Sequence, residues 1–325
     1  MKEREETTLL QKIGKLADAR GLEVYAVGGF VRDKLLGKQS KDIDFVVVGS
    51  GPDFARAVAK ELRTRRVTVY QKFGTALVQV GEYKLEFVGA RRESYRGESR
   101  KPAVEAADLH TDLARRDFTI NALALALNAA RFGEIVDPFD GRKDLRKGIV
   151  RTPLEPNRTF SDDPLRIMRA IRFATQLDFE IAPATLAGIR NNVERLRIVS
   201  QERITDEFLK ILAAAKPSTG FRLMDETGVL AVVFPEMLAM KGVEQIDGHH
   251  HKDVFFHTLQ VLDNVAARSD NLFLRYTALV HDIAKPRTKQ FVKGKGWTFH
   301  DHEELGARML PAIGRRLRLP VEMTK

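Results

Sequence analysis

The chain has 325 residues, 43% hydrophobic and 30% charged, a composition typical of a globular protein with two or three domains. It has no apolar run of about 18 residues, so we expect neither a membrane span nor a membrane partner. The absence of cysteine excludes disulfides and thiolate metal sites and fits a cytoplasmic location. The net charge of +10 favours nucleic acid or nucleotide phosphates as partners, the alternative being solubility alone.

The first 150 residues are predicted to form an α/β head with a small mixed sheet. Short runs of β-branched and aromatic residues alternate with amphipathic helical patterns and with glycine turns. In chain order, the expected elements are strand 23–27, helix 30–36 ended by Gly37, strand 42–48, helix 53–62, and a hairpin of strands 73–80 and 83–88.

Residues 88–114 are charged and lack apolar periodicity, so we expect a mobile basic loop, followed by a helix over 115–127. Residues 135–152 are predicted to hold turns and a short strand. Strand signals nearly vanish beyond about residue 155, which indicates an all-α C-terminal region. The expected domains are the head at 1–150, a helical neck at 151–225 and a helical domain at 226–325.

Asp42 and Asp44 open the apolar strand 42–48 and, being two residues apart, leave it on the same face. Carboxylates this close repel each other unless a cation lies between them. Mg²⁺ typically binds one or two carboxylates plus substrate phosphates, so we predict a catalytic Mg²⁺ site here. Glu86 would add a third acid if its strand neighbours 42–48. The alternative is that all three side chains face solvent.

Gly28-Gly29 separates the first strand from the first helix, and Arg32 follows within one helical turn. Glycines at such a turn let backbone N–H groups approach a phosphate, and an arginine adds a charge-assisted contact. A glycine pair alone is weak evidence. Its position shortly before the Asp42/Asp44 strand predicts an anion site beside a metal site.

Two later stretches add candidate nucleotide-binding residues. RRDFTINA offers Arg116 for a triphosphate and Asp117 for a ribose hydroxyl, with Asn121 one turn later. A helix start with Asp117 in its first turn is the alternative. DDPLRIMRAIRF is predicted to form a helix with an apolar stripe and a basic stripe. The basic stripe either faces solvent or lines a nucleotide site. The basic stripe consists of Arg166, Arg169 and Arg172.

Together these motifs resemble those of the polymerase-β-type nucleotidyltransferases, in the branch of tRNA nucleotidyltransferases and bacterial poly(A) polymerases. VGGFVRDKLLG with DIDFVVV is similar to the opening motif, RRDFTINALA to the second, and SDDPLRIMRAIRF to the nucleotide-selecting motif. The one departure is Asp162, where the family motif usually has glutamate.

This resemblance implies an enzyme that adds CMP and AMP from CTP and ATP to the tRNA 3′ end without a template. It implies in-line attack of the 3′-hydroxyl on the α-phosphate, with Mg²⁺ on Asp42 and Asp44 and release of pyrophosphate. It assigns base reading to Asp163 and Arg166, and places Arg169 near the incoming nucleotide. Arg172 is assigned to the same nucleotide and its phosphates.

Seven of the eight histidines lie between residues 249 and 302. His257 and the pair His281-Asp282 in LVHDIAKP resemble two parts of the HD metal phosphohydrolase pattern, and His302 is a further candidate ligand. The pattern's distant aspartate is not identifiable, and we expect the chain to be truncated after this region. The site either holds a second divalent metal or belongs to a helical scaffold.

The sequence is also compatible with other functions. A relative that adds only A, adds only CC, or makes poly(A) would share the same motifs. A metal phosphohydrolase with an RNA-binding head, or a basic RNA-binding protein without enzymatic activity, would fit the charge and the histidines. The sequence leaves the oligomeric state open.

Overall fold

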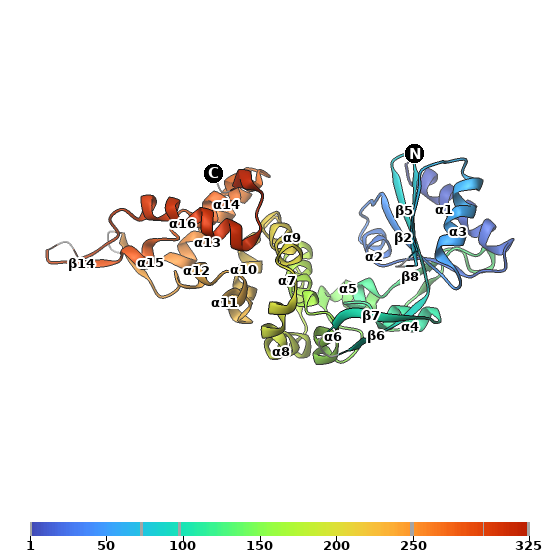
Figure 1. The fold of residues 1–325 in the computed structure, drawn as a ribbon, viewed down its shortest axis with the longest axis horizontal. Helices are drawn as coiled ribbons and strands as arrows, with labels where there is room; N and C mark the ends of the chain where they lie inside the picture. The colour runs from blue at the N-terminus through green and yellow to red at the C-terminus, as the bar shows by residue number, and fades with distance from the viewer. Residues whose placement is uncertain (1, 72–73, 97–98, 248–249, 295, 324–325) are drawn as a thin grey trace. The chain divides into compact units, whose positions relative to one another are not determined.

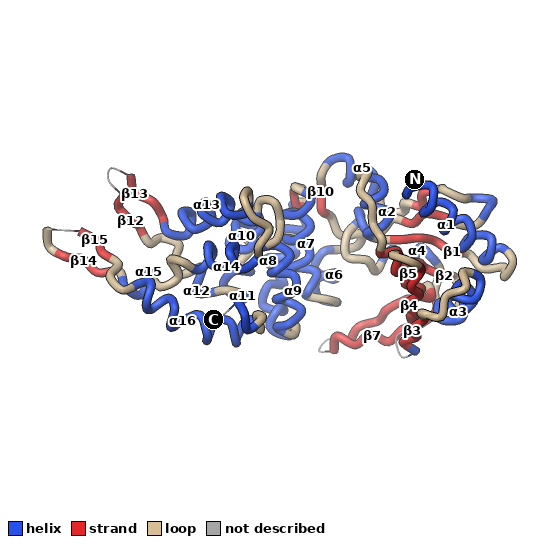
Figure 2. The backbone as a smooth tube through the Cα atoms, turned by 90° about the horizontal axis from the view of Figure 1, so that it is seen from above, coloured by secondary structure: helices blue, strands red, loops and turns tan. Residues whose placement is uncertain are grey.

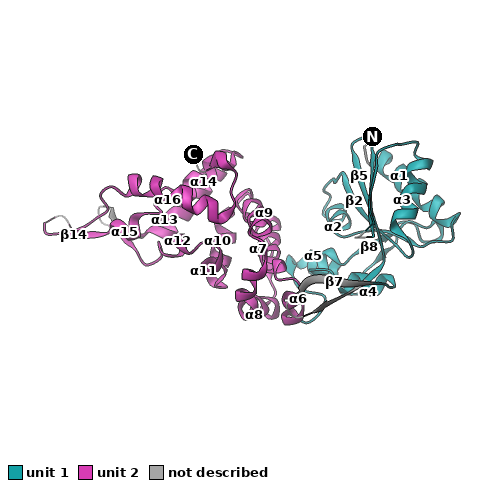
Figure 3. Ribbon diagram, viewed as in Figure 1, with its two compact units in different colours: residues 1–155 teal, residues 156–325 magenta. Residues whose placement is uncertain are grey.

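A computed structural model describes residues 2–71, 74–96, 99–247, 250–294 and 296–323. The chain divides into two compact units, Met1–Glu155 and Pro156–Lys325 (Figures 1 and 3). The first unit contains the predicted α/β head. The second contains the predicted helical region, and its subdivision at residue 225 stays a prediction.

A seven-stranded sheet organises the first unit, with strand order β3-β4-β5-β2-β1-β8-β9. The pair β2 and β5 is parallel, and the other neighbours are antiparallel, so the predicted mixed sheet is confirmed. The strands are β1 (Val24–Val27), β2 (Asp42–Val47), β3 (Val67–Tyr70), β4 (Thr75–Val80), β5 (Tyr83–Gly89), β8 (Ala124–Ala126) and β9 (Ile135–Val136).

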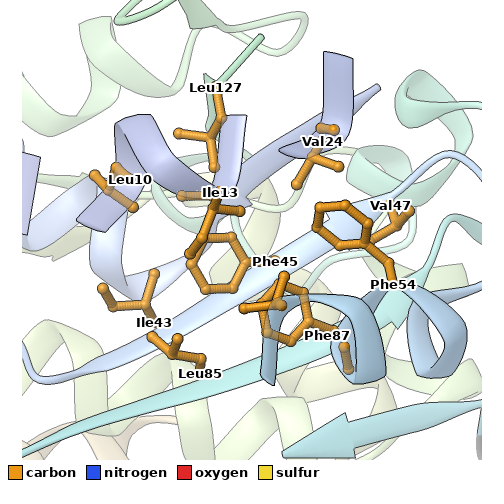
Figure 4. Close-up of a cluster of buried hydrophobic side chains, with 14 of the residues drawn as sticks. Leu10, Ile13, Val24, Ile43, Phe45, Val47, Phe54, Leu85, Phe87 and Leu127 are labelled. Carbon is orange, nitrogen blue, oxygen red and sulfur yellow. The ribbon is translucent and has the colours of Figure 1, made fainter. Parts of the chain in front are cut away.

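Three helices accompany the sheet: α1 (Lys2–Asp18), α2 (Gly29–Leu35) and α3 (Gly51–Glu61). Side chains from α1 and α3 enter the same apolar cluster as those of the central strands (Figure 4). At its centre Phe45 of β2 stacks on Phe87 of β5 with ring centroids 4.6 Å apart, and Phe54 of α3 meets Phe87 edge-on at 5.7 Å. Burial of these rings fixes β2 against β5.

The alternation of β2 separates the core from the candidate site. Ile43 and Phe45 are fully buried, whereas Asp42 and Asp44 are exposed on the opposite face. In β5, Phe87 is buried and Glu86 exposed in the same way. The predicted common face of the two aspartates is confirmed.

The prediction of a loop over 88–114 is wrong, while its mobility stays a prediction. This segment forms a hairpin of β6 (Arg91–Arg96) and β7 (Ser99–Ala106), and then helix α4 (Leu109–Ala114). Backbone hydrogen bonds can hold a hairpin whatever the polarity of its side chains. The lack of an apolar pattern therefore did not exclude strands.

The prediction of a helix over 115–127 is also wrong. The chain makes a 3₁₀ turn, η2 (Thr119–Asn121), and continues as β8. Here alanines and leucines alternate: Leu123 and Leu125 enter the cluster with α1 and α3, while Ala122 and Ala124 enter a separate buried cluster. That period of two belongs to a strand with both faces covered.

Residues 126–152 complete the first unit with more helix than predicted. They contain η3 (Ala129–Arg131), helix α5 (Gly141–Lys147) and strand β10 (Ile149–Val150) in addition to β9. Gly148, with φ 66°, adopts the left-handed conformation that ends α5.

The second unit is mainly helical, as predicted (Figure 2). Two short hairpins, β12–β13 and β14–β15, are exceptions to the all-α prediction, because strands of three or four residues are too short to show a period. The strands are β11 (Glu180–Ile181), β12 (Glu244–Asp247), β13 (His250–Asp253), β14 (Gln290–Val292) and β15 (Gly296–Thr298).

The helices of this unit follow one another with short connections. They are α6 (Pro156–Asp162), α7 (Leu165–Leu177), α8 (Pro183–Asn192), η4 (Val193–Ile198), α9 (Gln201–Leu212), α10 (Pro217–Glu226), α11 (Val229–Val233), α12 (Pro235–Leu238), α13 (Val254–Ala266), α14 (Leu272–Val280), α15 (Lys285–Thr288), α16 (His302–Leu317) and η5 (Val321–Met323). Among the described residues, no helix has the length and apolarity needed to cross a membrane.

Arg275 fixes α14, the helix that leads directly to His281. The residue is 1% exposed, and its guanidinium group donates to four backbone oxygens over distances of 2.8 to 3.2 Å. The acceptors belong to Leu212, Ala214, Ala266 and Ser269. These carbonyls lie at or just beyond the ends of α9 and α13, where no intrahelical donor remains.

Arg275→Met should therefore lower the free energy of unfolding by about 3 kcal/mol, because several buried carbonyls would lose their donor. Urea denaturation followed by circular dichroism measures this. Arg268→Met, which changes an exposed arginine just after α13, is the matched control and should have little effect. Equal stability of the two variants would contradict the anchoring of α14 by Arg275.

Candidate active site and His/Asp cluster

The parallel register of β2 and β5 pairs Asp44 with Glu86 and Asp42 with Lys84. Glu86 therefore neighbours the aspartate strand, as the sequence analysis required for a three-acid site. Asp42 lies at the open end of β2, with a carboxylate oxygen 3.9 Å from the Lys84 ammonium group. Three carboxylates thus share the face of the sheet that points away from the core.

The local electrostatics disfavour the ionised form of two of these acids. Reduced hydration raises the pKa of Asp44; Arg116 counteracts this and Asp42 adds to it. Reduced hydration also raises the pKa of Glu86, and repulsion by Asp44 adds to that shift, while Arg91 opposes it. An all-oxygen donor set whose members repel one another suits a hard divalent cation such as Mg²⁺.

Arg116 lies against the glycine turn between β1 and α2, close to the acidic face. Gly28 has φ 72°, a conformation that favours glycine. A β-carbon at Gly28 would lie 2.8 Å from Nη1 of Arg116 and 3.9 Å from Oδ2 of Asp44. The guanidinium group therefore lies close over the glycine turn, beside the Asp44 carboxylate. At Gly29 a β-carbon would meet Nη2 of Arg32 at 3.5 Å.

Arg116 is held in this position by Asp112, a residue that was not predicted from the sequence. Its side chain is fully buried and accepts from Nη2 of Arg115 at 2.7 Å and from Nη2 of Arg116 at 3.2 Å. The signal was present in DLARR, where an acid precedes the arginines by three and four residues on one helical face.

A second buried chain of contacts joins the other predicted residues of the head. Nη1 of Arg32 donates to Oδ1 of Asn121 at 2.7 Å, and Nδ2 of Asn121 donates to Oδ1 of Asp117 at 3.0 Å. Asp117 also accepts from the backbone N–H of Phe118 at 2.8 Å. The structure thus connects Arg32 to Asn121 and Asp117, which lie far from it in sequence. The contacts of these three residues with nucleotide stay predictions.

In the second unit, Asp163 and Arg166 lie at the start of α7. Oδ1 of Asp163 accepts from the backbone N–H of Leu165 at 3.3 Å, and Oδ2 lies 3.6 Å from Nη2 of Arg203 on α9. Nη1 of Arg166 donates to the backbone oxygen of Thr159 at 3.4 Å. Both side chains are half-buried, so each keeps part of its surface accessible to a base.

The other two arginines of the basic stripe are buried or half-buried and do not form an open face. Arg172 is 9% exposed, forms an ion pair with Glu207 on α9 and stacks over Phe173 at 3.9 Å. Arg169 lies 5.4 Å from the same ring centroid and is half-buried. Glu207 and Arg203 are four residues apart on α9, so one face of this helix contacts both Arg172 and Asp163. The predicted contact of Arg172 with nucleotide phosphates stays a prediction.

The histidine-rich part of the chain forms a compact cluster. One potential ligand atom from each of His257, His281 and Asp282 lies within 4.8 Å of the others. Asp282 is 2% exposed in its side chain and also contacts Nζ of Lys285 at 2.8 Å and Nε2 of His302 at 3.4 Å. The predicted grouping is present, with His302 beside it.

Charges in this cluster keep Asp282 ionised. Burial raises its pKa, but hydrogen bonds from His281 and Lys285 outweigh that effect and lower the pKa to about 2. The hydrogen bond to Asp282 raises the pKa of His281, while burial opposes it. Two imidazoles and an ionised carboxylate form a donor set that suits several divalent metals.

Comparisons with known proteins agree with this geometry. Residues 24–151 match the family model "Poly A polymerase head domain", residues 178–241 "Probable RNA and SrmB- binding site of polymerase A", and residues 254–324 "HD domain". The Multifunctional CCA protein of Chromobacterium violaceum is 39% identical over 92% of this chain and 71% of its own length.

Solved structures show the same likeness. A tRNA nucleotidyltransferase complexed with a primer tRNA and an incoming ATP analog has a TM-score of 0.66 and 31% identity, over 82% of this chain and 75% of that one. The CCA-adding enzyme of Thermotoga maritima complexed with tRNA_CCA has a TM-score of 0.68 and 28% identity, over 97% and 67%. The chain belongs to the CCA tRNA nucleotidyltransferase family, which confirms the predicted fold and enzyme class.

The glycine turn gives a direct test of the Arg116 position. Gly28→Ala should weaken ATP binding about tenfold, because the new methyl group displaces the guanidinium group. Isothermal titration calorimetry measures the affinity. Gly37→Ala is the matched control, since Gly37 also has positive φ, 70°, but no atom lies within 4 Å of the added β-carbon. Equal ATP affinity of both variants would exclude this arrangement.

Proposed function

We propose that this chain adds CMP and AMP from CTP and ATP to the 3′ end of tRNA in the cytoplasm, building or repairing CCA. The observation that carries the proposal is the three-carboxylate face of β2 and β5, with Arg116 beside Asp44 at the glycine turn. The relatives named above support the choice of tRNA, CTP and ATP. A narrower activity, adding only A, only CC, or poly(A), would use the same groups.

Asp42, Asp44 and Glu86 would hold Mg²⁺, because their shared face supplies oxygen donors and an excess of negative charge. When bound there, Mg²⁺ lowers the pKa of the attacking 3′-hydroxyl and neutralises charge that develops on the phosphate. The strand pairing sets the positions of these carboxylates, since β2 and β5 are paired in parallel and Phe45 stacks on Phe87.

The other residues bind and orient the nucleotide. Arg116 attracts the triphosphate, and Asp112 keeps its guanidinium group directed at the glycine turn. Arg32 and Asn121 orient Asp117, whose carboxylate accepts from a ribose hydroxyl. Asp163 and Arg166 offer acceptors and donors to the edge of the base. Arg203 and Glu207 hold the helix that carries them.

The reaction is tested with tRNA lacking CCA, supplied with CTP alone, ATP alone and both. CCA addition requires CMP incorporation first and AMP only afterwards. Long A tails with ATP alone would replace this function with poly(A) synthesis. CMP incorporation without subsequent AMP addition would indicate a CC-adding enzyme. AMP addition without CMP incorporation would indicate an A-adding enzyme.

Asp42→Asn and Asp44→Asn should each lower incorporation by roughly a hundredfold or more, because loss of a metal ligand removes several kcal/mol of transition-state stabilisation. Mg²⁺ should raise the Tm of the unmodified protein and not that of the variants. Asp53→Asn, an exposed acid on α3, is the control for charge alone. Full incorporation by Asp42→Asn would overturn the transferase assignment.

A second function is favoured by the His/Asp cluster, namely hydrolysis of a phosphate ester with a divalent metal. His257, His281 and Asp282 converge, and Asp282 stays ionised well below neutral pH. Lys285 and His302 hold the carboxylate of Asp282 from two sides. This activity would be separate from nucleotide addition.

His281→Gln should reduce Zn²⁺ or Ni²⁺ affinity at least tenfold, because one of three converging ligands is lost. Calorimetry on the full chain measures metal binding directly. His110→Gln, which changes the histidine of the head, should bind like the unmodified protein. Unchanged affinity in His281→Gln would favour the scaffold interpretation of the cluster.

A further inference from the structure

The face that carries the three carboxylates continues beyond Glu86 toward the edge of the sheet. Strands β4 and β3 follow β5 in the strand order, and β3 is the edge strand (Figure 2). The register pairs Glu86 with Leu77 of β4, and Leu77 with Thr68 of β3. Paired residues of neighbouring strands point to the same side of a sheet, so these side chains share the face of Asp44.

We call this continuation the edge surface. A second row of paired residues runs from Asp42 through β5 and β4 to the residue just before β3, and a third row ends at the last residue of β3. The burial pattern agrees, because Val67 and Val69 of β3 pack against the core while the residues that follow each of them are exposed. The edge surface consists of Arg66, Thr68, Tyr70, Leu77, Gln79 and Lys84.

Tyr70 places an exposed aromatic ring on this mainly polar surface. The residue is 48% exposed, and its side chain has neither a hydrogen bond nor a ring contact with another residue that the structure describes. A ring so exposed keeps a π-face available to a ligand. Stacking on such rings binds single-stranded nucleic acid without regard to sequence, because every base has a π-face.

Two cations lie on the same surface. Arg66 is exposed and forms no ion pair with any described acid. The side chain of Lys84 is 60% exposed, and its ammonium group lies 3.9 Å from the Asp42 carboxylate. Arg66 and Tyr70 are four residues apart along one strand, which separates them by about 13 Å. Cations beside an aromatic ring are the combination that binds the phosphates and the bases of one RNA strand.

The edge surface and the glycine turn lie on opposite sides of Asp44. In the strand order, β1 with its glycine turn borders β2 on one side, and β5, β4 and β3 follow on the other. Arg116, which is predicted to bind the triphosphate, lies at the glycine turn. A transfer reaction needs its two substrates to meet at the acids, so a nucleotide on the β1 side leaves the β5 side for the RNA.

We propose that the edge surface binds the RNA strand that precedes the reacting 3′-hydroxyl, with a base stacked on Tyr70 and phosphates on Arg66 and Lys84. The inference rests on the proposed transferase function and supplies residues that position its RNA. Three strand spacings, about 14 Å, separate β2 from β3, whereas stacked bases follow one another at roughly 3.4 Å. Tyr70 and Arg66 therefore hold nucleotides upstream of the reacting one and act as positioning residues.

Arg66→Ala should raise the KM for tRNA lacking CCA severalfold and leave the KM for CTP unchanged, because the lost charge faces the RNA and not the nucleotide. The slope of log KM against log salt concentration should also fall by about 0.7, the contribution of one phosphate contact in a single strand. Steady-state CMP incorporation at several salt concentrations measures both. Arg65→Ala is the matched control, since it removes the same charge from an exposed neighbour outside the strand register.

Tyr70→Leu should raise the same KM for tRNA about tenfold, because a leucine side chain cannot stack on a base. Tyr70→Phe retains the ring and should leave this KM nearly unchanged. Circular dichroism checks that both variants fold, which the exposure of the residue leads us to expect. An equal increase in the two variants would overturn the stacking on Tyr70.

The outcomes separate this inference from the proposed function. A KM for tRNA that is the same in Arg66→Ala, Tyr70→Leu and Arg65→Ala overturns the edge surface while the transferase assignment stands. If the unmodified protein incorporates no nucleotide, the proposed function fails, and fluorescence anisotropy with labelled oligouridylate then tests RNA binding alone. Weaker binding by Arg66→Ala than by Arg65→Ala supports an RNA surface. Unchanged RNA binding together with lost binding of labelled polyglutamate assigns the surface to an acidic protein segment and overturns the proposal.

Discussion

The parallel contact between β2 and β5 is the constraint on which the head depends. On one face it stacks Phe45 on Phe87 in the core, and on the other it sets Asp44 beside Glu86. The apolar face stabilises the pairing, and the acidic face opposes it through repulsion and reduced hydration. Burial of the rings offsets this repulsion and holds the like charges of the two strands side by side.

The surrounding residues are arranged to supply positive charge at that face. Gly28 has no side chain, and Arg116 uses the space that a β-carbon would fill. Asp112, fully buried, holds the arginine there. The head thus contains a buried acid, Asp112, that orients an arginine, and exposed acids on the sheet face that the sequence predicts as cation ligands.

In the second unit, too, charged partners hold functional side chains in place, at two positions. On α9, Arg203 contacts Asp163, which lies just before α7, and Glu207 contacts Arg172 of α7. The helix predicted to select the nucleotide therefore has charged partners on α9. In the HD region, Lys285 and His302 hold Asp282. Buried ion pairs add little net stability, because desolvation offsets their attraction, but they fix side chains in one orientation.

Much of this protein was determined by the sequence alone. The period of two in DIDFVVV places two aspartates opposite a buried face, and the three motifs indicate the family. Local patterns also predicted α2, α3 and the β4–β5 hairpin.

Local patterns failed at 88–114, where strands pair through backbone groups, and at 115–127, where alanine and leucine alternate along a strand. The pairing of Glu86 with Asp44, the contact of Asp112 with Arg116 and the ion pair of Arg172 with Glu207 all required the folded chain. Hydrophobic period and composition are local properties of the chain. Strand register and ion pairing depend on which distant segments the core brings together.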